Sequence, residues 1–285
     1  MLTFRTFTPL HAGTGQGIGV IDLPIAREGS TQIPILPGSG IKGVFRDAAV
    51  ALPAEDNCEV EKIFGPLMVD ESSSASSIAF TDGKLVLFPV RSIAGIFAWV
   101  TCPFILGRLF EESTIVGLQA PNSIPTFSDQ NQCFAHANNQ ISVRPDRMVI
   151  EDISLTNTAD PTGDLEQLCK FLADITGMPE NKLQQKLCVV SDDVMLYLLK
   201  SSTEVRARIR IDDEKKIVAD GQLWYEETLP AETFLISLCM AGGPQVNQDV
   251  VVGCLETLIS KNTLFQFGGK QTVGHGFCKV KAVVG

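Results

Sequence analysis

The order of strand and helix patterns along the chain constrains its fold more than any other feature. Alternating residues at 2–10 predict a first strand, and Ile41, Val44, Phe45 and Ala48 recur at helical spacing. A buried strand follows at 85–90. The C-terminal part is predicted as strand, helix and strand (232–241, 246–260 and 277–284). This order predicts a ferredoxin-like α+β sandwich, the topology that RNA-recognition (RRM-like) modules also use.

Three long segments interrupt this order, at about 11–37, about 113–163 and a hairpin at about 205–225. The first has glycines at 13, 15, 17, 19 and 29 and no helical period. Connections of this length inside a compact domain are usually functional or disordered. We therefore expect one elaborated domain over residues 1–285. Further helices are expected at 103–113, 164–175 and 191–200, and a mobile loop at 66–77.

Composition and cysteine spacing limit where the protein works. No run of about 18 apolar residues suggests a membrane span, and the N-terminus does not resemble a signal peptide. We therefore expect a cytoplasmic protein without a membrane partner. The closest two of the eight cysteines are 15 residues apart, so neither a structural zinc site nor a disulfide framework is expected. Most cysteines are expected to be small core residues.

The motifs of common enzyme classes are absent from the sequence. The glycines at 15, 17 and 19 lack the spacing of a dinucleotide fingerprint, and PGSGIKG (37–43) lacks the ending of a phosphate loop. Histidines 11, 136 and 275 have no local metal-binding spacing. The net charge of −10 argues against non-specific nucleic-acid binding, but it permits a local basic groove.

The segment PGSGIKGVFR is the first candidate RNA contact. A helix that begins near Ser39 directs free N–H groups toward the glycine-rich loop, where they favour anions. Lys42 and Arg46 are four residues apart and share one helix face, which predicts contact with a phosphate backbone. The alternative is a solvated helix face beside a tight turn.

The alternating segment VRARIRID is the second candidate. Arg206, Arg208 and Arg210 point to one side of a strand, at a spacing of about 6.6 Å that is close to that of phosphates along a single strand. The alternative is a solvent-facing hairpin, and the acidic run Asp212–Glu214 that follows would weaken its positive potential.

Two more loops contain candidate residues. In FGGKQTVGHGFCKVK, glycines permit close backbone approach, and Lys270 and His275 are candidates for phosphate contact; the alternative is a plain hairpin turn. In GVIDLPIARE, Asp22 lies between apolar residues before Pro24, and its alternative role is that of a turn former.

Taken together, four segments resemble the RAMP-superfamily backbone subunit of type III-B (Cmr) CRISPR effector complexes. They span nearly the whole chain in the family's order. They are HAGTGQGIGVIDLPIAREGSTQIPILPGSGIKGVFR, PVRSIAGIFAWVTCPFIL, RARIRIDDEKKIVADGQLWYEETLP and FQFGGKQTVGHGF.

The resemblance implies a ferredoxin-like palm with inserted finger and thumb elements. Several copies would stack into a helical filament on one CRISPR RNA, beside other subunits that include the large and small subunits. Target RNA would pair with the guide and be cut at regular intervals. The resemblance places Asp22 at the cut, with His11 and Glu227 nearby and Glu226 as the alternative register. It also assigns the helix with Ser39, Lys42 and Arg46 to guide contact.

The chemistry of RNA cleavage restricts what an aspartate can do. The neighbouring 2′-hydroxyl can serve as nucleophile, and a free aspartate is a poor base near neutral pH. We therefore expect Asp22 to hold a divalent metal, Mg²⁺ or Mn²⁺, or to orient the 2′-hydroxyl, with His11 as acid or base. Two alternatives stay open: a non-catalytic crRNA-binding scaffold, and a RAMP-type endoribonuclease that processes CRISPR RNA.

Overall fold

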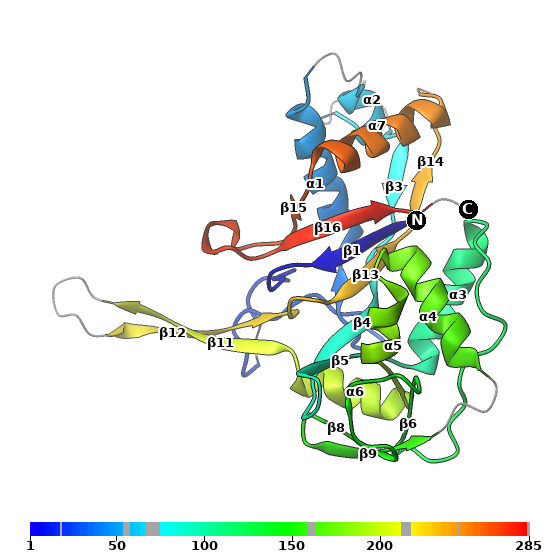
Figure 1. Ribbon diagram of the computed structural model, residues 1–285. Helices are drawn as coiled ribbons and strands as arrows, with labels where there is room; N and C mark the ends of the chain where they lie inside the picture. Colours follow the sequence, from blue (N-terminus) through cyan, green and yellow to red (C-terminus); the bar gives the residue numbers. More distant parts are fainter. Residues whose placement is uncertain are drawn as a thin grey trace.

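One large mixed sheet runs through the protein in the computed structural model, which describes residues 1–17, 19–53, 58–66, 75–158, 163–211, 218–243 and 246–283 (Figure 1). Its strand order is β15-β16-β1-β13-β4-β5-β10-β6-β9-β8-β7, with β2 paired to β4. The strands are β1 (Leu2–Thr6), β2 (Ile35–Leu36), β3 (Ile78–Phe80), β4 (Gly83–Arg91), β5 (Phe97–Thr101), β6 (Gln132–Ala135), β7 (Ser142–Arg144), β8 (Arg147–Ile150), β9 (Ile153–Thr158), β10 (Leu187–Val190), β11 (Glu204–Ile211), β12 (Val218–Thr228), β13 (Phe234–Ser237), β14 (Cys239–Ala241), β15 (Phe265–Gln266) and β16 (Phe277–Ala282). The helices are α1 (Gly38–Val50), α2 (Val60–Phe64), α3 (Pro103–Ile115), α4 (Asp164–Thr176), α5 (Glu180–Lys186), α6 (Asp192–Ser201), α7 (Gln248–Lys261) and the short 3₁₀ helix η2 (Gln271–Val273).

The first half of the sheet is antiparallel throughout, in the order β16-β1-β13-β4. Its strands alternate between two cores, as β1 illustrates. Leu2 and Phe4 are buried in the core that also contains residues of α1 and α7. Thr3, on the other face, donates its hydroxyl to the carbonyl of Ile175 in α4. α1 and α7 therefore cover one face of these strands, and α4 covers the other (Figure 1).

The second half of the sheet mixes parallel and antiparallel pairs. β10 lies parallel to β5, and β9 lies parallel to β6. β4 connects the halves, because Leu85 and Leu87 pair with β13 while the stretch from Phe88 to Arg91 pairs with β5. Residues 113–163, expected as an insertion, contain β6 to β9 within their described part, and these strands extend the large sheet.

The predicted hairpin is a separate two-stranded sheet, β11–β12, which projects away from the body (Figure 1). Ala207 pairs with Tyr225 and Ile209 with Leu223, so these four side chains share one face. Arg206 and Arg208 lie on the other face, as the alternating pattern predicts. The acidic run 212–214 lies outside the described residues.

Most predicted elements agree with the structure within a few residues. The predicted strand 232–241 is divided at Leu238 into β13 and β14. At this position the backbone N–H of Leu238 donates to the Thr81 hydroxyl and not to a neighbouring strand. Ser191 stands at the N-cap of α6 as predicted, but its hydroxyl donates to the carbonyl of Gln130 and does not cap the helix. The centre of the expected loop 66–77, residues 67–74, lies outside the described residues.

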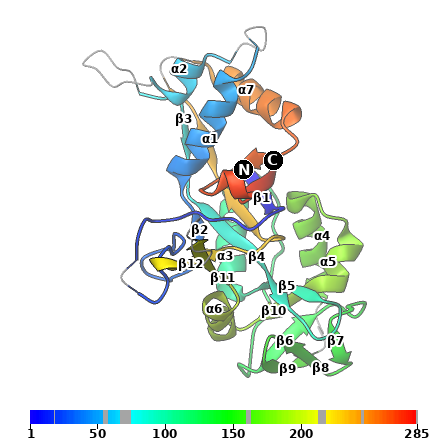
Figure 2. The same ribbon diagram turned by 90° about the vertical axis from the view of Figure 1, so that its left-hand side faces the viewer.

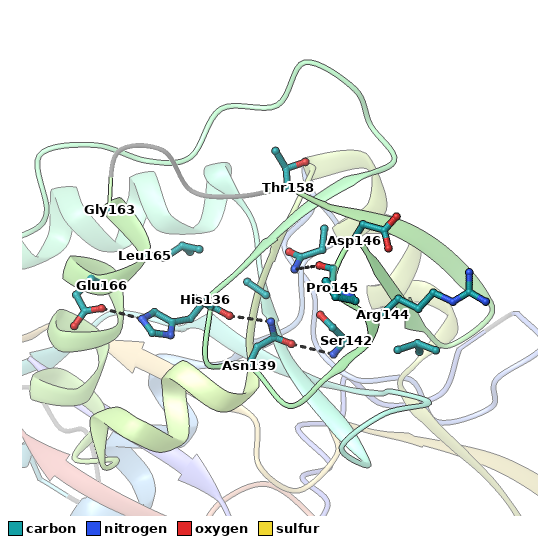
Figure 3. A pocket seen from close by; sticks show the side chains of 14 residues that line it. His136, Asn139, Ser142, Arg144, Pro145, Asp146, Thr158, Gly163, Leu165 and Glu166 are labelled. Carbon is teal, nitrogen blue, oxygen red and sulfur yellow. Dashed lines mark hydrogen bonds and ion pairs between the residues drawn. The ribbon is translucent and has the colours of Figure 1, made fainter.

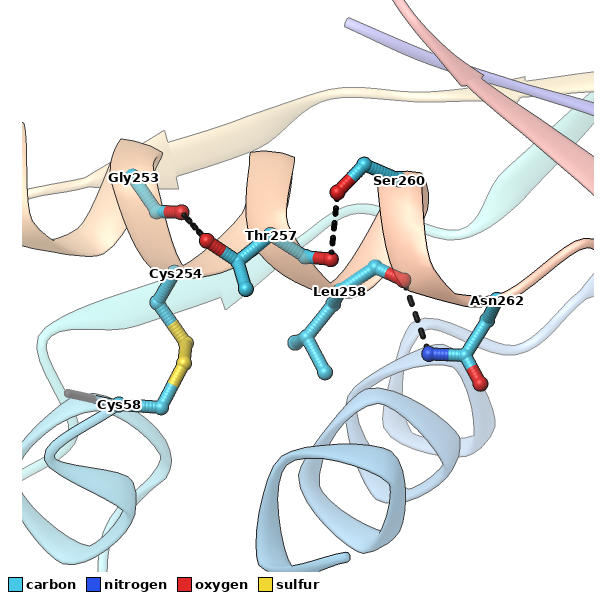
Figure 4. Close-up of a disulfide and its surroundings, with 7 residues drawn as sticks. All are labelled: Cys58, Gly253, Cys254, Thr257, Leu258, Ser260 and Asn262. Carbon is cyan, nitrogen blue, oxygen red and sulfur yellow. Dashed lines mark hydrogen bonds between the residues drawn. A yellow bond between two sulfur atoms is a disulfide. The ribbon is translucent and has the colours of Figure 1, made fainter. Parts of the chain in front are cut away.

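The expectation that the chain has no disulfide is wrong at one pair. Cys58, which precedes α2, is bonded to Cys254 in the middle of α7 (Figure 4). The spacing of the cysteines could not predict this bond, because the two residues are 196 positions apart and only the fold brings them together. The other six cysteines are free, and all of them except the half-buried Cys239 are buried, as expected for small core residues.

Candidate functional site

Three segments that are distant in sequence meet at the base of the projecting hairpin. They are the glycine-rich loop after β1, the end of β12, and the loop between β15 and β16 (Figures 1 and 2). Three consecutive residues of β12, Tyr225, Glu226 and Glu227, provide most of the contacts between them. This junction brings together Asp22, His11, Glu226, Glu227, Arg208, Lys270 and His275 of the predicted site residues.

Asp22 is exposed on the loop, beside the edge of β12. Its Oδ2 accepts a hydrogen bond from the backbone N–H of Tyr225 at 2.8 Å. The next residue, Leu23, pairs in parallel with β12 through backbone bonds to Tyr225 and Glu227. One carboxylate oxygen is thus fixed by the protein backbone while the side chain faces solvent.

Glu227 is buried, with 3% exposure, and its carboxylate has three donors. Arg27 Nη2 donates to Oε1 at 2.5 Å, the Thr203 hydroxyl donates to Oε1 at 2.9 Å, and the backbone N–H of Ile25 donates to Oε2 at 3.1 Å. A buried carboxylate needs such partners to offset its desolvation. This arrangement suits a structural clamp between β12 and the glycine-rich loop better than proton transfer.

Glu226 is equally buried and joins β12 to the C-terminal loop. It accepts from Lys270 Nζ at 2.6 Å, from the Trp224 indole at 2.7 Å and from Arg208 Nε at 3.1 Å. Burial by itself raises the pKa of Glu226, but these three donors outweigh burial and lower the pKa to about 2. Glu226 is therefore ionised at neutral pH, and it forms ion pairs with both Lys270 and Arg208.

His11 lies beneath the loop, with its Nδ1 2.7 Å from the backbone carbonyl of Glu227. A carbonyl can only accept, so Nδ1 bears a hydrogen, and in the neutral tautomer the lone pair is on Nε2. Two glycines make room for this arrangement. A Cβ on Gly13 would lie 2.5 Å from His11 Nε2, and a Cβ on Gly268 would lie 2.3 Å from the His11 carbonyl oxygen.

The remaining basic candidates of the hairpin and the C-terminal loop differ in exposure. His275 is buried, its Nε2 lies 3.3 Å from Arg208 Nη2, and burial and then the nearby arginines lower its pKa. Arg206 is exposed and donates to Glu204 on its own strand. Arg210, nearer the hairpin tip, is exposed as well. The three arginines are therefore not equivalent, because only Arg208 is engaged by the site.

The predicted guide-contacting residues of α1 lie apart from the hairpin base. Ser39 is exposed at the N-terminus of the helix, where Asp82 accepts the backbone N–H of Gly38. Lys42 donates to the Ser76 hydroxyl at 2.7 Å and Arg46 to the Pro66 carbonyl at 3.3 Å. Burial and the nearby Arg46 lower the pKa of Lys42.

The residue types at the hairpin base limit how a metal could bind. Within the described ranges, no group of three or more His, Cys, Asp or Glu side chains is arranged to hold a metal ion. Glu226 and Glu227 are already occupied by cationic partners, which leaves Asp22 as the available carboxylate. Mg²⁺ is commonly bound through one or two carboxylates together with water and substrate phosphates, so Asp22 fits only a site that RNA completes.

A cavity of about 870 Å³ lies elsewhere, between α4 and residues of β6, β7 and β9 with their adjoining loops (Figure 3). His136, hydrogen-bonded to Glu166 at 2.8 Å, and Asn139 are among its lining residues. No predicted site residue lines it. The residues that the sequence analysis missed at the hairpin base include Arg27, Thr203, Trp224 and Tyr225. Arg27 stands inside the quoted segment GVIDLPIARE, but nothing local distinguishes it from a surface arginine.

Comparison with known proteins gives a consistent result. A family model described as the RAMP superfamily matches residues 3–279. The Cmr endoribonuclease Cmr4 of Pyrococcus furiosus is 34% identical over 280 residues, which cover 96% of this chain and 92% of that protein. The crystal structure of oligomeric Cmr4 from the same organism has a TM-score of 0.75 at 27% identity and covers 98% of this chain and 96% of its own. The cryo-EM structure of the type III-B Cmr-beta complex bound to cognate target RNA contains a chain with the same fold, with a TM-score of 0.74 at 20% identity over 98% of this chain and 95% of that one.

Fold and site together define an α+β protein in which a projecting hairpin and a glycine-rich loop surround one group of charged side chains. The family with this architecture is the RAMP superfamily, and this chain belongs to it. The family resemblance inferred from the sequence is thereby confirmed. No helix in the described part of the chain is long and apolar enough to cross a membrane.

Proposed function

We propose that this chain is the crRNA-binding backbone subunit of a type III-B CRISPR effector complex that cuts complementary target RNA at regular intervals. The observation that carries this proposal is the 34% identity, over nearly the whole chain, with a protein named as a Cmr endoribonuclease. Its partners are CRISPR RNA, target RNA, copies of itself in a filament, and the other effector subunits including the large and small subunits. The complex acts in the cytoplasm.

The palm of this subunit is ferredoxin-like. Support comes from the antiparallel order β16-β1-β13-β4, in which α1 follows the first strand and α7 precedes the last. That order is the one a βαββαβ unit requires. The hairpin β11–β12 is the thumb, and the exposed Arg206 and Arg210 give it a basic edge for RNA.

Asp22 is the centre of the cleavage site. It is exposed and fixed by the Tyr225 backbone N–H, so it can orient the 2′-hydroxyl next to the scissile phosphate without rearranging. His11 presents Nε2 as the proton acceptor, since Nδ1 is bound to the Glu227 carbonyl. Glu226 and Glu227 hold the surrounding segments in place.

Asp22 would also hold a divalent cation, Mg²⁺ or Mn²⁺, together with RNA phosphates and water. When bound, the cation supplies charge stabilisation at the phosphoryl oxygens. Ser39, Lys42 and Arg46 of α1 bind the guide backbone, and Lys270 and His275 contact RNA phosphates at the hairpin base. Contacts of this type position RNA and do not read its sequence.

The test is cleavage of a labelled complementary RNA by the reconstituted complex. Asp22→Ala is expected to abolish the regularly spaced products while assembly and target binding remain. Asp22→Asn is the matched variant, because an amide oxygen still accepts from Tyr225 N–H but carries no charge; it is expected to be as inactive as Asp22→Ala. Asp47→Ala, an exposed acidic residue of α1, is the control.

Either of two results would contradict this proposal. Unchanged products with Asp22→Ala would make the chain a scaffold whose cutting residues lie elsewhere. Cleavage of repeat RNA by the isolated chain, without guide or metal, would indicate a processing endoribonuclease. Products formed at full rate in excess chelator would refute the role of the cation alone.

A further inference from the structure

Arg27 occupies a central place at the hairpin base. Its guanidinium donates to three separate elements: the Glu227 carboxylate on β12, the carbonyl of Leu199 in α6, and the carbonyl of Gln32 across its own loop. Its side chain is only 17% exposed. An arginine with fixed geometry and several acceptors orders its surroundings more firmly than a surface ion pair does.

The loop that carries Asp22 is held to β12 by few other contacts. Leu23 forms two backbone bonds with the strand, and the N–H of Ile25 donates to Glu227 Oε2. Arg27 fixes the same carboxylate through its other oxygen, Oε1. The Thr203 hydroxyl donates to Oε1 as well, so Arg27 is the charged one of two donors that orient the Glu227 carboxylate and, with it, the anchor of Ile25.

We infer that Arg27 is a positioning residue for RNA cleavage: through Glu227 it holds the Leu23–Ile25 segment against β12 and thereby fixes Asp22 beside Tyr225. This inference rests on the proposed function. It assigns Glu227 the role of anchoring the loop, and it excludes Glu227 from proton transfer in the cut.

A neighbouring ion pair provides a matched control. Glu28, next to Arg27, receives two hydrogen bonds from Arg108 of α3, at 2.5 and 2.9 Å. This pair pins the same loop to the body, but it makes no contact with the Glu227 carboxylate. Loss of the pair should loosen the loop around Glu28 only, whereas loss of Arg27 should displace Asp22.

The experiment measures single-turnover cleavage by the full effector complex containing Arg27→Met, Arg27→Lys or Arg108→Met. Arg27→Met is expected to lower the rate constant about a hundredfold with target affinity unchanged, because small misplacements of a catalytic group have effects of this size. Arg27→Lys, which retains a cationic donor for Glu227, is expected to recover about tenfold of that loss. Arg108→Met is expected to cut within about twofold of wild type, because its pair does not reach the site.

The role of Glu227 is tested by the pH dependence of the rate. Glu227→Gln should slow cleavage without changing the shape of the pH profile, and the double variant with Arg27→Met should be no slower than the slower single variant. A limb of the profile that disappears in Glu227→Gln would overturn the inference, because it would make Glu227 a proton-transfer group.

Hydrogen exchange supplies a readout that does not depend on cleavage. In the full chain, Arg27→Met should increase exchange at the amides of Leu23 and Ile25, and Arg108→Met should not. If Arg27→Met cuts at the wild-type rate while Asp22→Ala is inactive, the positioning role is refuted and the proposed function stands. If Asp22→Ala remains active, the proposed function fails, and the exchange result still decides whether Arg27 anchors the loop.

Discussion

Reduction of the Cys58–Cys254 bond should produce a large loss of stability. The bond joins residues 196 positions apart, so it restricts most of the unfolded chain. The loop-entropy relation gives about 5 kcal/mol for a loop of this length. With an unfolding entropy that scales with 285 residues, this corresponds to a fall in Tm of about 8 °C. Strain and residual structure in the unfolded chain make these values upper limits.

The assay is calorimetry of the oxidised and reduced protein. Tm should fall on addition of a phosphine reductant, and Cys58→Ser should show the lower Tm without reductant and no further change with it. Cys239→Ser, at a half-buried free cysteine, is the control. Denatured oxidised protein should show six reactive thiols and reduced protein eight, as the one bond and six free cysteines require. A reductant effect of equal size in Cys58→Ser, or eight thiols before reduction, would refute the reasoning.

Two further predictions concern the hairpin base. The pKa of Glu226 is lowered from 4.5 to about 2, so its contribution to stability is complete above about pH 4.5 and is lost as pH falls toward 2. The stability difference between wild type and Glu226→Gln, from urea unfolding, should shrink across that window; a constant difference would refute the pairing with Lys270. Gly268→Ala should destabilise by about 3 kcal/mol, through positive φ and a clash with the His11 carbonyl, whereas Gly274→Ala, with positive φ and open space, should cost about 1 kcal/mol. Equal losses in thermal unfolding would show that the clash is relieved.

The elements that pack the core were predictable from the sequence because their patterns are local. Apolar residues at helical spacing identified α1 and α7, and alternation identified β1 and the hairpin strand β11. α1, α7 and β1 each bury one face, so their own residues contain the signal, whereas β11 alternates although both of its faces are largely exposed. The family resemblance extended these local predictions to the order of segments along nearly the whole chain.

The strands β6 to β9 were missed for a related reason. Their segment is rich in Asn, Gln, Ser and Pro, which is typical of loops, and β7 exposes two of its three residues. Partners in the sheet, and not local propensity, decide their conformation. The disulfide was missed on the same grounds, since only tertiary structure brings Cys58 to Cys254.

The site residues were predicted as types but not as partners. The sequence treated Arg206, Arg208 and Arg210 as one basic row, whereas Arg208 is bound to Glu226 and His275 and the other two are exposed. Which carboxylate approaches which cation depends on how three distant segments meet. No spacing rule contains that information.

The pairing of charges at the hairpin base also explains how an acidic chain can accommodate RNA. Glu226 is neutralised by Lys270 and Arg208, and Glu227 is neutralised by Arg27. Two buried carboxylates therefore add little negative potential to the hairpin base, so the net charge of −10 is a poor guide to the local field there. The same pairing has a cost for RNA binding. A phosphate that approaches Lys270 must compete with a carboxylate that is ionised at neutral pH. Under the proposed function, we therefore expect the backbone contacts that determine affinity to come from the exposed arginines of the hairpin and from α1.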